Sequence, residues 1–345
     1  MTLRPSARVA VVGASGFLGG ELLRLLASHP RFEVAMVCAH ASAGAELATV
    51  KPALAGLGRR VLEPIDADAI GARADLAFLA MPHGESAPVA DELSRRGVDV
   101  VDLGSDLRLA DPADYPRYYG KEHARPQLLA RAFYGLPELT GAPPAGAGRL
   151  VASPGCFATA LALAIVPLAA RLAPAARVAV TGLTGSSGSG AAPSVGVHHS
   201  LRTTGLVAYK PLEHQHLGEL SQLVRARAGR DVAVDFAPHS APVVRGILLS
   251  IHLRAAELEG DALELLASAY RDHPLVTVSA GPVQMAEVTG SIRTRIGVTS
   301  VGGAVFVACA IDNLIKGGAG QAIENANLMM GWPLALGLPL VGTWP

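Results

Sequence analysis

One cysteine follows a sharp turn signal and opens a run that favours a helix. Cys156 comes directly after Ser153-Pro154-Gly155 and begins a stretch rich in alanine and leucine, which is typical of a turn followed by a helix. In the first turn of a helix, unpaired backbone N–H groups and the helix dipole stabilise a thiolate and lower the pKa of the thiol. Cys156 is therefore a candidate nucleophile. The alternative is a small residue buried in the core.

A second segment carries two histidines and an acid. His214, His216 and Glu219 lie within residues 209–219, and no Cys or acid cluster stands beside them at metal-ligand spacing. General acid–base chemistry is therefore a better use of these histidines than metal binding. If the segment forms a helix, we expect Glu219 to fix the tautomer of His214 and to raise its pKa toward the working pH.

The N-terminal residues combine a strand, a glycine turn and a helix. Residues 8–12 form a valine-rich run, residues 13–19 follow the pattern Gly-x-x-Gly-x-x-Gly, and residues 21–26 have helical composition. In this order the glycines let the backbone approach a pyrophosphate, which binds at the helix N-terminus. The residues predicted to bind a dinucleotide here are Gly13, Ala14, Ser15, Gly16, Phe17, Leu18 and Gly19.

The end of the next predicted strand, residues 32–37, indicates which dinucleotide binds. NAD-specific sites usually place an acid about 20 residues beyond the glycines, where it binds the ribose 2′-hydroxyl. Residues 34–45 hold no acid, which favours NADP, with Ser42 or His40 near the 2′-phosphate. The arginine that often pairs with this phosphate is also missing from residues 34–45.

Strands and helices alternate through the first half of the chain. Further strands are predicted at residues 75–80 and 98–103, so we expect an α/β fold with a parallel, doubly wound sheet and a ligand at its carboxyl edge. His83 and Arg108 follow these two strands. They are candidate ligand contacts; the alternatives are a capping or packing role for His83 and a surface ion pair for Arg108.

The second half of the chain begins with a strand and a glycine-rich loop. The strand is predicted at residues 177–181, and the loop covers residues 182–190. Its amides near Ser187 and Gly188 suit anionic groups or a nicotinamide carboxamide; a plain linker is the alternative. Later strands are predicted at residues 243–252 and 303–311, and a last helix at residues 321–330.

Composition indicates the number of domains and argues against several kinds of site and partner. The 345 residues suggest two domains, and Lys plus Arg equal Asp plus Glu at 29 each, which does not suggest a nucleic-acid or membrane-surface partner. The three cysteines (Cys38, Cys156 and Cys309) are far apart, so we expect neither disulfides nor a zinc site and place the protein in the cytoplasm. The charge-free stretch between Arg149 and Arg171 is interrupted by Pro154 and Pro167, and a buried core helix is predicted there rather than a membrane span.

Four motifs in order resemble one known family. Residues 13–19, 153–159, 214–216 and 310–317 are similar to those of N-acetyl-γ-glutamyl-phosphate reductases, within the wider aspartate-semialdehyde dehydrogenase family. The resemblance covers essentially the whole chain. It implies NADPH-dependent reduction of an acyl phosphate to an aldehyde in arginine biosynthesis, by a homodimer or homotetramer.

The resemblance also implies an architecture. We expect a Rossmann-type parallel-sheet NADP-binding domain at residues 1–154 and an α+β catalytic and dimerisation domain at residues 155–312. Residues 313–345 are expected to carry a C-terminal helix that returns to the NADP-binding domain.

The same resemblance implies a role for each site residue. Cys156 forms a thioester with the substrate, and His214 is the acid–base group with His216 as its assistant, or the reverse. Glu219 supports them, and no metal is expected. Further cofactor contacts are implied for Ser42, His83, Ser187, Gly188, Asn313 and Lys316. Substrate contacts are implied for Arg108, Ser153, Arg202 and Arg245.

Some features leave other functions open. Gln215 stands where the family usually carries Arg, and the pair His198-His199 and the end of the chain from Met330 are similar to a sister branch. That branch reduces aminoadipyl or glutamyl phosphate held on an amino-group carrier protein, for lysine or arginine synthesis. A short-chain-type epimerase or reductase needs Tyr-x-x-x-Lys, which is absent from the sequence. A non-catalytic NADP-binding sensor is the remaining class.

Overall fold

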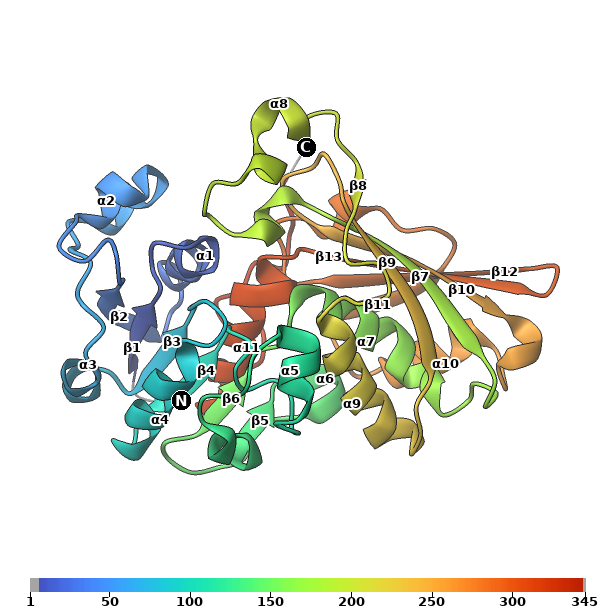
Figure 1. Cartoon of the computed structure of the whole chain (residues 1–345), viewed down its shortest axis with the longest axis horizontal. Coiled ribbons are helices and arrows are strands. Elements are labelled where there is room, and N and C mark those ends of the chain that lie inside the picture. Colours follow the sequence, from blue (N-terminus) through green and yellow to red (C-terminus); the bar gives the residue numbers. More distant parts are fainter. Residues whose placement is uncertain (1–5, 344–345) are drawn as a thin grey trace. The chain divides into compact units, whose positions relative to one another are not determined.

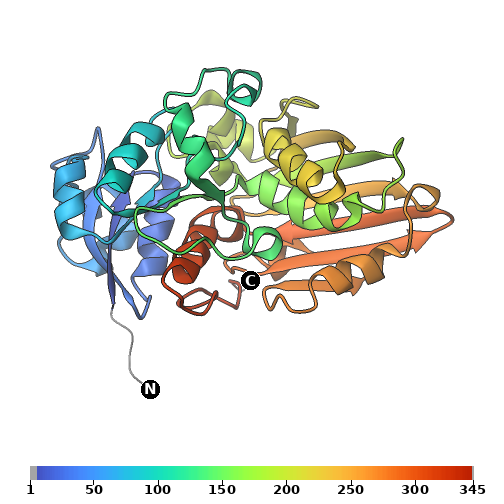
Figure 2. The ribbon, with the colours of Figure 1, turned by 90° about the horizontal axis from the view of Figure 1, so that it is seen from below.

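The computed structural model describes residues 6–343, and the chain divides into two compact units (Figures 1 and 2). The first unit holds residues 6–154 together with 318–338, and the second holds residues 155–317 together with 339–343. Each unit has its own sheet.

The first unit is built on a six-stranded parallel sheet. Its strands are β1 (Ala7–Val12), β2 (Phe32–Cys38), β3 (Leu76–Leu79), β4 (Asp99–Asp102), β5 (Ala132–Tyr134) and β6 (Leu150–Ala152), in the order β2-β1-β3-β4-β6-β5. All residues of β3, β4 and β6 are buried, as expected for strands covered on both faces. The chain leaves β1 on one side for β2 and returns on the other for β3, so a ligand crevice is expected at the carboxyl end of β1. The predicted doubly wound α/β sheet is confirmed.

Short helices connect these strands. They are α1 (Phe17–Leu26), α2 (Leu47–Val50), α3 (Ala67–Arg73), α4 (Ser86–Arg95), α5 (Asp114–Tyr119) and α6 (Pro137–Thr140), with 3₁₀ turns η1 (Pro52–Leu57) and η2 (Pro126–Arg131). The buried face of α1 carries Leu22, Leu23, Leu25 and Leu26. Asp66 begins α3 because its carboxylate accepts hydrogen bonds from the amides of Asp68 and Ala69.

One helix from the end of the chain belongs to the first unit. The side-chain amides of Gln321 and Asn325 in α11 (Gly320–Met329) donate hydrogen bonds to the carbonyl oxygen of Gly135. Gly135 has no side chain, and a Cβ there would lie 2.5 Å from the amide of Asn325. The bare backbone at residue 135 therefore admits the polar face of α11.

The second unit is built on a seven-stranded mixed sheet. Its strands are β7 (Arg177–Thr184), β8 (Val207–Ala208), β9 (Ala233–Ser240), β10 (Ile247–Arg254), β11 (Val276–Ala280), β12 (Thr294–Val301) and β13 (Ala304–Ile311), in the order β11-β12-β13-β10-β7-β9-β8. The central strands β7, β10, β13 and β12 pair antiparallel, whereas β7 with β9 and β11 with β12 pair parallel. The α+β domain that the family resemblance implied is confirmed.

Helices α7 (Cys156–Ala169) and α9 (His216–Ala228) lie side by side on this sheet, green and yellow in Figures 1 and 2. The unit also contains α8 (His199–Arg202), α10 (Ala262–Ala269) and 3₁₀ turns η3 (Ser186–Ser189), η4 (Val195–Val197), η5 (Ala255–Glu257) and η6 (Met285–Glu287). A π-type turn, η7 (Ile315–Ala319), leads from the second unit into the first. Nearly every residue of α7 is buried, so the charge-free stretch is a core helix, as predicted. No helix in residues 6–343 is long and apolar enough to cross a membrane.

Three boundaries differ from the sequence-based expectation. Strand β7 continues to Thr184, because Gly182 to Thr184 pair with both β9 and β10, so the predicted loop is shorter. Strand β10 begins at Ile247 rather than at residue 243, because Gly246 has a φ of +107°. Of the predicted C-terminal segment, residues 313–345, residues 318–338 belong to the first unit, whereas residues 313–317 and 339–343 belong to the second. The amide of Thr343 donates to the carbonyl oxygen of Thr289, and the amide of Ile292 donates to that of Pro339, so residues 339–343 pack on the second unit.

A buried histidine makes the first unit sensitive to acid. His29 Nε2 lies 3.1 Å from Asn327 Oδ1, and its Nδ1 accepts the amide of Phe32 at 3.0 Å. Burial is the main cause that lowers the pKa of His29, and a proton on Nδ1 would remove the acceptor. The folded state therefore binds fewer protons than the unfolded state, so stability is complete above the unfolded pKa of about 6.5 and falls as the pH drops below it.

We expect His29→Gln to lower the free energy of unfolding at neutral pH by about 1–3 kcal/mol and to flatten its decline between neutral and acid pH. Urea unfolding across this pH range measures both effects. The control is His40→Gln, which removes an exposed histidine of the same unit. An unchanged pH dependence in His29→Gln would contradict the assignment.

Candidate active site

The candidate nucleophile begins a buried helix. Cys156 is the first residue of α7, and the residue before it, Gly155, is extended with no side-chain cap on the helix. The backbone amides of this first turn and the positive end of the helix dipole therefore lie beside the thiol. Gly317 packs directly against the cysteine, since a Cβ on Gly317 would lie 2.7 Å from the Cβ of Cys156. Cys156 is partly exposed, whereas Cys38 and Cys309 are buried.

A buried carboxyl group joins the cysteine turn to a histidine. Glu219, in the first turn of α9, is fully buried, and its Oε2 accepts the amide of Gly155 at 3.0 Å. Its Oε1 lies 3.9 Å from His216 Nε2. Gly155 leaves the room for this imidazole, because a Cβ on Gly155 would lie 2.2 Å from His216 Nε2. The structure thus brings together Gly155, Cys156, His216 and Glu219.

His214 lies deeper and among aromatic rings. Its Nδ1 accepts the backbone amide of His216 at 3.2 Å, and its ring contacts those of Phe157 and Phe236 edge-on. Burial is the main cause that lowers the pKa of His214 to about 2, the charges of His216 and Lys210 add to it, and Glu219 opposes it. The expectation that Glu219 raises this pKa toward the working pH is therefore wrong, because burial outweighs the carboxylate. His214 is a neutral imidazole at ordinary pH.

The sequence reasoning missed a tyrosine in this site. Burial raises the pKa of Tyr209, and the charge of the Cys156 thiolate raises it further, while Arg202 lowers it. The phenol therefore lies within electrostatic range of both the thiol and the guanidinium. Its ring packs edge-on against His214, with the centroids 5.8 Å apart. The available signal was its place five residues before His214 in the histidine segment.

Two arginines of the second unit differ in what they offer to a ligand. Arg202 is buried, and its Nη2 donates to the carbonyl oxygen of Ala241. Its buried Nε has no hydrogen-bond partner within residues 6–343, so one charged donor there suits an anion. Arg245 instead makes two hydrogen bonds of 3.1 Å to the buried carboxylate of Asp312.

The other two candidate substrate residues belong to the first unit. Arg108 donates to the carbonyl oxygens of Ser153 and Leu103 at 2.9 and 2.8 Å. The hydroxyl of Ser153 is buried and has no partner in the described part of the chain. The guanidinium of Arg108 therefore fixes the backbone just before the cysteine turn.

The glycine turn of the first unit fits a dinucleotide. Gly13 has a φ of +85°, and a Cβ on Gly19 would lie 2.2 Å from the carbonyl oxygen of Gly13. The bare glycines thus let α1 pack tightly onto the turn after β1. Gly16 stands before α1 without a side-chain cap, which leaves amides of the first turn for a pyrophosphate. Ala14, Ser15, Phe17 and Leu18 complete this turn.

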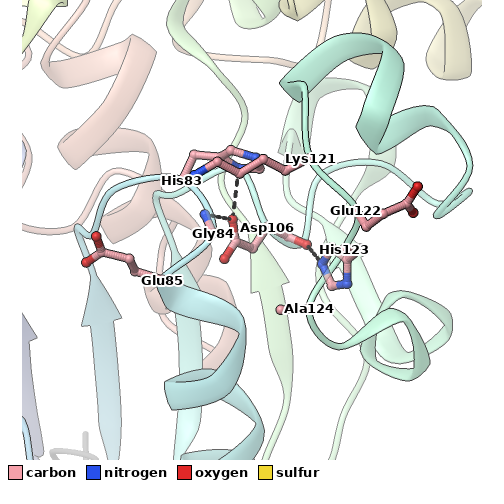
Figure 3. A pocket seen from close by; sticks show the side chains of 8 residues that line it. All are labelled: His83, Gly84, Glu85, Asp106, Lys121, Glu122, His123 and Ala124. Carbon is pink, nitrogen blue, oxygen red and sulfur yellow. Dashed lines mark hydrogen bonds and ion pairs between the residues drawn. The ribbon is translucent and has the colours of Figure 1, made fainter.

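Two further predicted cofactor residues follow strands of the same sheet. Ser42 lies in the turn after β2, where its carbonyl oxygen accepts the amide of Ala45. His83 follows β3 and lines a pocket in the first unit (Figure 3). Its Nδ1 lies 3.0 Å from Asp106 Oδ1, and its ring stacks on Tyr119. Burial is the main cause that lowers the pKa of His83. Its buried Nε2 has no partner among the described residues.

The remaining predicted cofactor residues belong to the second unit. Asn313 Oδ1 accepts the amide of Gly246 at 2.7 Å, and its Nδ2 donates to the hydroxyl of Ser187 at 3.0 Å. Gly188 follows Ser187 within η3, and Lys316 is fully buried. Asn313 thus holds the turn that contains Ser187 and Gly188. No cluster of three metal-ligating side chains is found in residues 6–343.

Both units match known domain families. Residues 8–144 match the family described as semialdehyde dehydrogenase, NAD binding domain, and residues 156–313 match the one described as semialdehyde dehydrogenase, dimerisation domain.

Curated proteins match over nearly the whole chain. One is the N-acetyl-gamma-glutamyl-phosphate reductase of Acidothermus cellulolyticus, 42% identical over 348 residues, which covers 98% of this chain and 99% of that protein. The protein of the same name from Paracoccus denitrificans is 41% identical over 347 residues with the same coverage. A solved structure of a probable aspartate-semialdehyde dehydrogenase from Pseudomonas aeruginosa superposes with a TM-score of 0.68 at 21% identity, covering 95% and 99% of the two chains. It shares the fold.

The geometry predicts how the thiols react with iodoacetamide in the native protein. Burial raises the pKa values of Cys38 and Cys309 to about 12, so we expect Cys156 alone to be alkylated. His216→Asn should slow this reaction about tenfold or more by removing the imidazole that packs against Gly155, the residue before the thiol. His214→Asn should slow the alkylation less, because a neutral buried imidazole carries no positive charge that could stabilise the thiolate.

Mass spectrometry of the alkylated protein identifies the thiol, and the time course gives the rate. Cys309→Ala is the control, and its labelling rate should equal that of the unchanged protein. Slower labelling of His214→Asn than of His216→Asn would show that His214, not His216, is the histidine that activates the thiol.

Proposed function

This chain belongs to the N-acetyl-gamma-glutamyl-phosphate reductase family, and we propose that it reduces N-acetyl-γ-glutamyl phosphate to N-acetylglutamate 5-semialdehyde with NADPH. The observation that carries the proposal is the contact of Glu219 with both the amide of Gly155 and the imidazole of His216. That contact joins the turn of a cysteine nucleophile to an acid–base pair. The substrate and the place in arginine biosynthesis follow the names of the full-length relatives.

The reaction begins at the Cys156 thiolate. Its sulfur attacks the acyl carbon, the carbon–oxygen bond to the phosphate breaks, and inorganic phosphate leaves with the bonding electrons. The product is a thioester on Cys156, which accepts a hydride more readily than a carboxylate does. NADPH, when bound, supplies the hydride that reduces this thioester. The carbon–sulfur bond of the resulting thiohemiacetal then breaks, which releases the semialdehyde and regenerates the thiol.

We assign the proton transfers to His216 with Glu219. Their distance of 3.9 Å and the position of His216 against Gly155 support this choice over His214. His216 takes the thiol proton before the attack, and the resulting imidazolium is stabilised by the Glu219 carboxylate. It then returns this proton to the Cys156 sulfur as the carbon–sulfur bond of the thiohemiacetal breaks. His214, neutral and tied to the His216 amide, orients this segment.

Anionic groups of the substrate need cationic partners. The unpaired Nε of Arg202 supports a contact with the substrate carboxylate or phosphate, and the charge of Arg202 also lowers the pKa of Tyr209. We assign Arg108 and Ser153 to substrate binding from the first unit. Arg245 is held by Asp312, so we assign it the support of the adjacent turn with Asn313.

The cofactor residues fall into two groups. The glycine turn, with residues 13–19, binds the pyrophosphate, and Ser42 and His83 bind further along the same sheet edge. Ser187, Gly188, Asn313 and Lys316 bind the nicotinamide end. The bare backbone at Gly13 and Gly19 supports the first assignment, and the hydrogen bond from Asn313 to Ser187 supports the second.

We further propose a homodimer or homotetramer in the cytoplasm. The match of residues 156–313 to a dimerisation domain supports self-association, and three separated free cysteines support a reducing compartment. The carrier-linked substrate is the alternative for the same chemistry.

The proposed reaction predicts the behaviour of Cys156→Ser. We expect its turnover to fall below a few per cent of normal, because a serine hydroxyl is a far weaker nucleophile than a thiolate. NADPH binding should stay unchanged, because Cys156 is not among the residues assigned to the nucleotide. NADPH consumption measures the first effect, and titration of nucleotide fluorescence measures the second.

Three substrates complete the experiment: N-acetyl-γ-glutamyl phosphate and the carrier-linked aminoadipyl and glutamyl phosphates. Cys309→Ser is the matched control and should retain full turnover. Binding of NADPH without turnover of any substrate by the unchanged protein would identify a sensor. Turnover of carrier-linked substrates alone would replace the proposed substrate.

A further inference from the structure

A segment beyond the end of β2 is folded back on itself. The amide of Leu47 donates to the carbonyl oxygen of Arg60 at 2.8 Å, and the amide of Leu62 donates to that of Ala45 at 2.9 Å. These two bonds hold the ends of residues 46–60 together beside the turn that contains Ser42. Residues 46–60 therefore form an excursion from the sheet whose two ends are held together near the carboxyl end of β2. Lys51 lies within this excursion.

Lys51 crosses the first turn of the dinucleotide-binding helix. Its Nζ lies 5.3 Å from the centre of the Phe17 ring, within the range of a cation–π contact. Its Cε lies 3.8 Å from the point where a Cβ on Gly20 would stand. The ammonium is thus held over α1 by an aromatic ring and a bare backbone, in the same unit as the glycine turn.

The ammonium of Lys51 lacks an anionic partner in the part of the chain that the structure describes. Within residues 6–343 no carboxylate pairs with its ammonium, and burial alone lowers its pKa. The other cations of this region are engaged: Arg59 binds Glu46 at 2.7 Å, and Arg60 donates to the carbonyl oxygen of Val34 at 2.9 Å. A partly buried ammonium without a counter-ion favours binding of an anion.

The anion expected near the end of β2 is the 2′-phosphate of NADPH. In doubly wound sheets the ribose 2′ substituent of the adenosine lies at the end of the second strand. Residues 34–45 of this chain hold neither an acid, which would repel the phosphate, nor the arginine that often binds it. We propose that Lys51, delivered by the excursion after β2, binds the 2′-phosphate and selects NADPH over NADH. This inference rests on the NADPH-dependent function proposed above.

Lys51→Met tests the inference by removing the charge and keeping most of the side-chain length. Isothermal titration gives dissociation constants for four probes: NADPH, NADH, 2′,5′-ADP and 5′-AMP. We expect NADPH and 2′,5′-ADP to bind at least about tenfold more weakly, because hydrogen bonds to charged groups are among the strong ones. NADH and 5′-AMP should bind as before, which also shows that the variant is folded. Lys51→Arg should keep the preference for the phosphorylated probes.

The matched control is Arg59→Met, which removes one positive charge from the same excursion. Its guanidinium is exposed and paired with Glu46, so the NADPH-to-NADH preference should not change. Three results would overturn the inference: an unchanged preference in Lys51→Met, an equal loss of affinity for all four probes, or an equal loss of preference in Arg59→Met. If the unchanged protein binds NADH as tightly as NADPH, the proposed cofactor is wrong as well. A preference that survives in Lys51→Met contradicts only the role of Lys51.

Discussion

The site depends on one buried carboxyl group and the two helices that it joins. Glu219, in the first turn of α9, accepts the amide that precedes α7 and lies beside the imidazole of His216. A carboxylate is stabilised in the first turn of a helix, and so is a thiolate at Cys156. The packing of α7 against α9 on the sheet therefore brings two helix N-termini to the same place. A buried carboxylate without such partners would be costly, which explains why Gly155 and His216 both approach it.

The first unit applies the same logic to a different anion. Its parallel strands end at one edge, and the turn after β1 is glycine-rich because a Cβ on Gly13 would meet the carbonyl oxygen of Ala80 at 2.2 Å. The first turn of α1 then offers its amides to a pyrophosphate. Lys51 adds a charge above that turn, carried by an excursion whose ends are hydrogen-bonded to each other. Helix N-termini thus serve covalent chemistry in one unit and nucleotide binding in the other.

The sequence predicted those features that depend on residues close together in the chain. The strand, glycine turn and helix of residues 8–26, the buried parallel strands and the helix that Cys156 opens follow from residue type and spacing. The low pKa of His214 did not, because it depends on Phe157 and Phe236, which pack on the ring from distant segments. Lys51 was missed for a similar reason: only the bonds between residues 45–47 and 60–62 bring it over α1. The two-part C-terminus likewise depends on long-range contacts, such as those of Asn325 and Thr343.

The most direct test of this account is the pH dependence of Cys156 alkylation in Glu219→Gln. The substitution keeps the size of the side chain and an oxygen for the Gly155 amide, but it removes the charge beside His216. We expect the apparent pKa of the thiol to rise and the alkylation rate at neutral pH to fall about tenfold or more, because an imidazolium near Cys156 is then less stable. The fold should stay intact, as thermal unfolding can show. A pH profile identical to that of the unchanged protein would contradict the central role of Glu219.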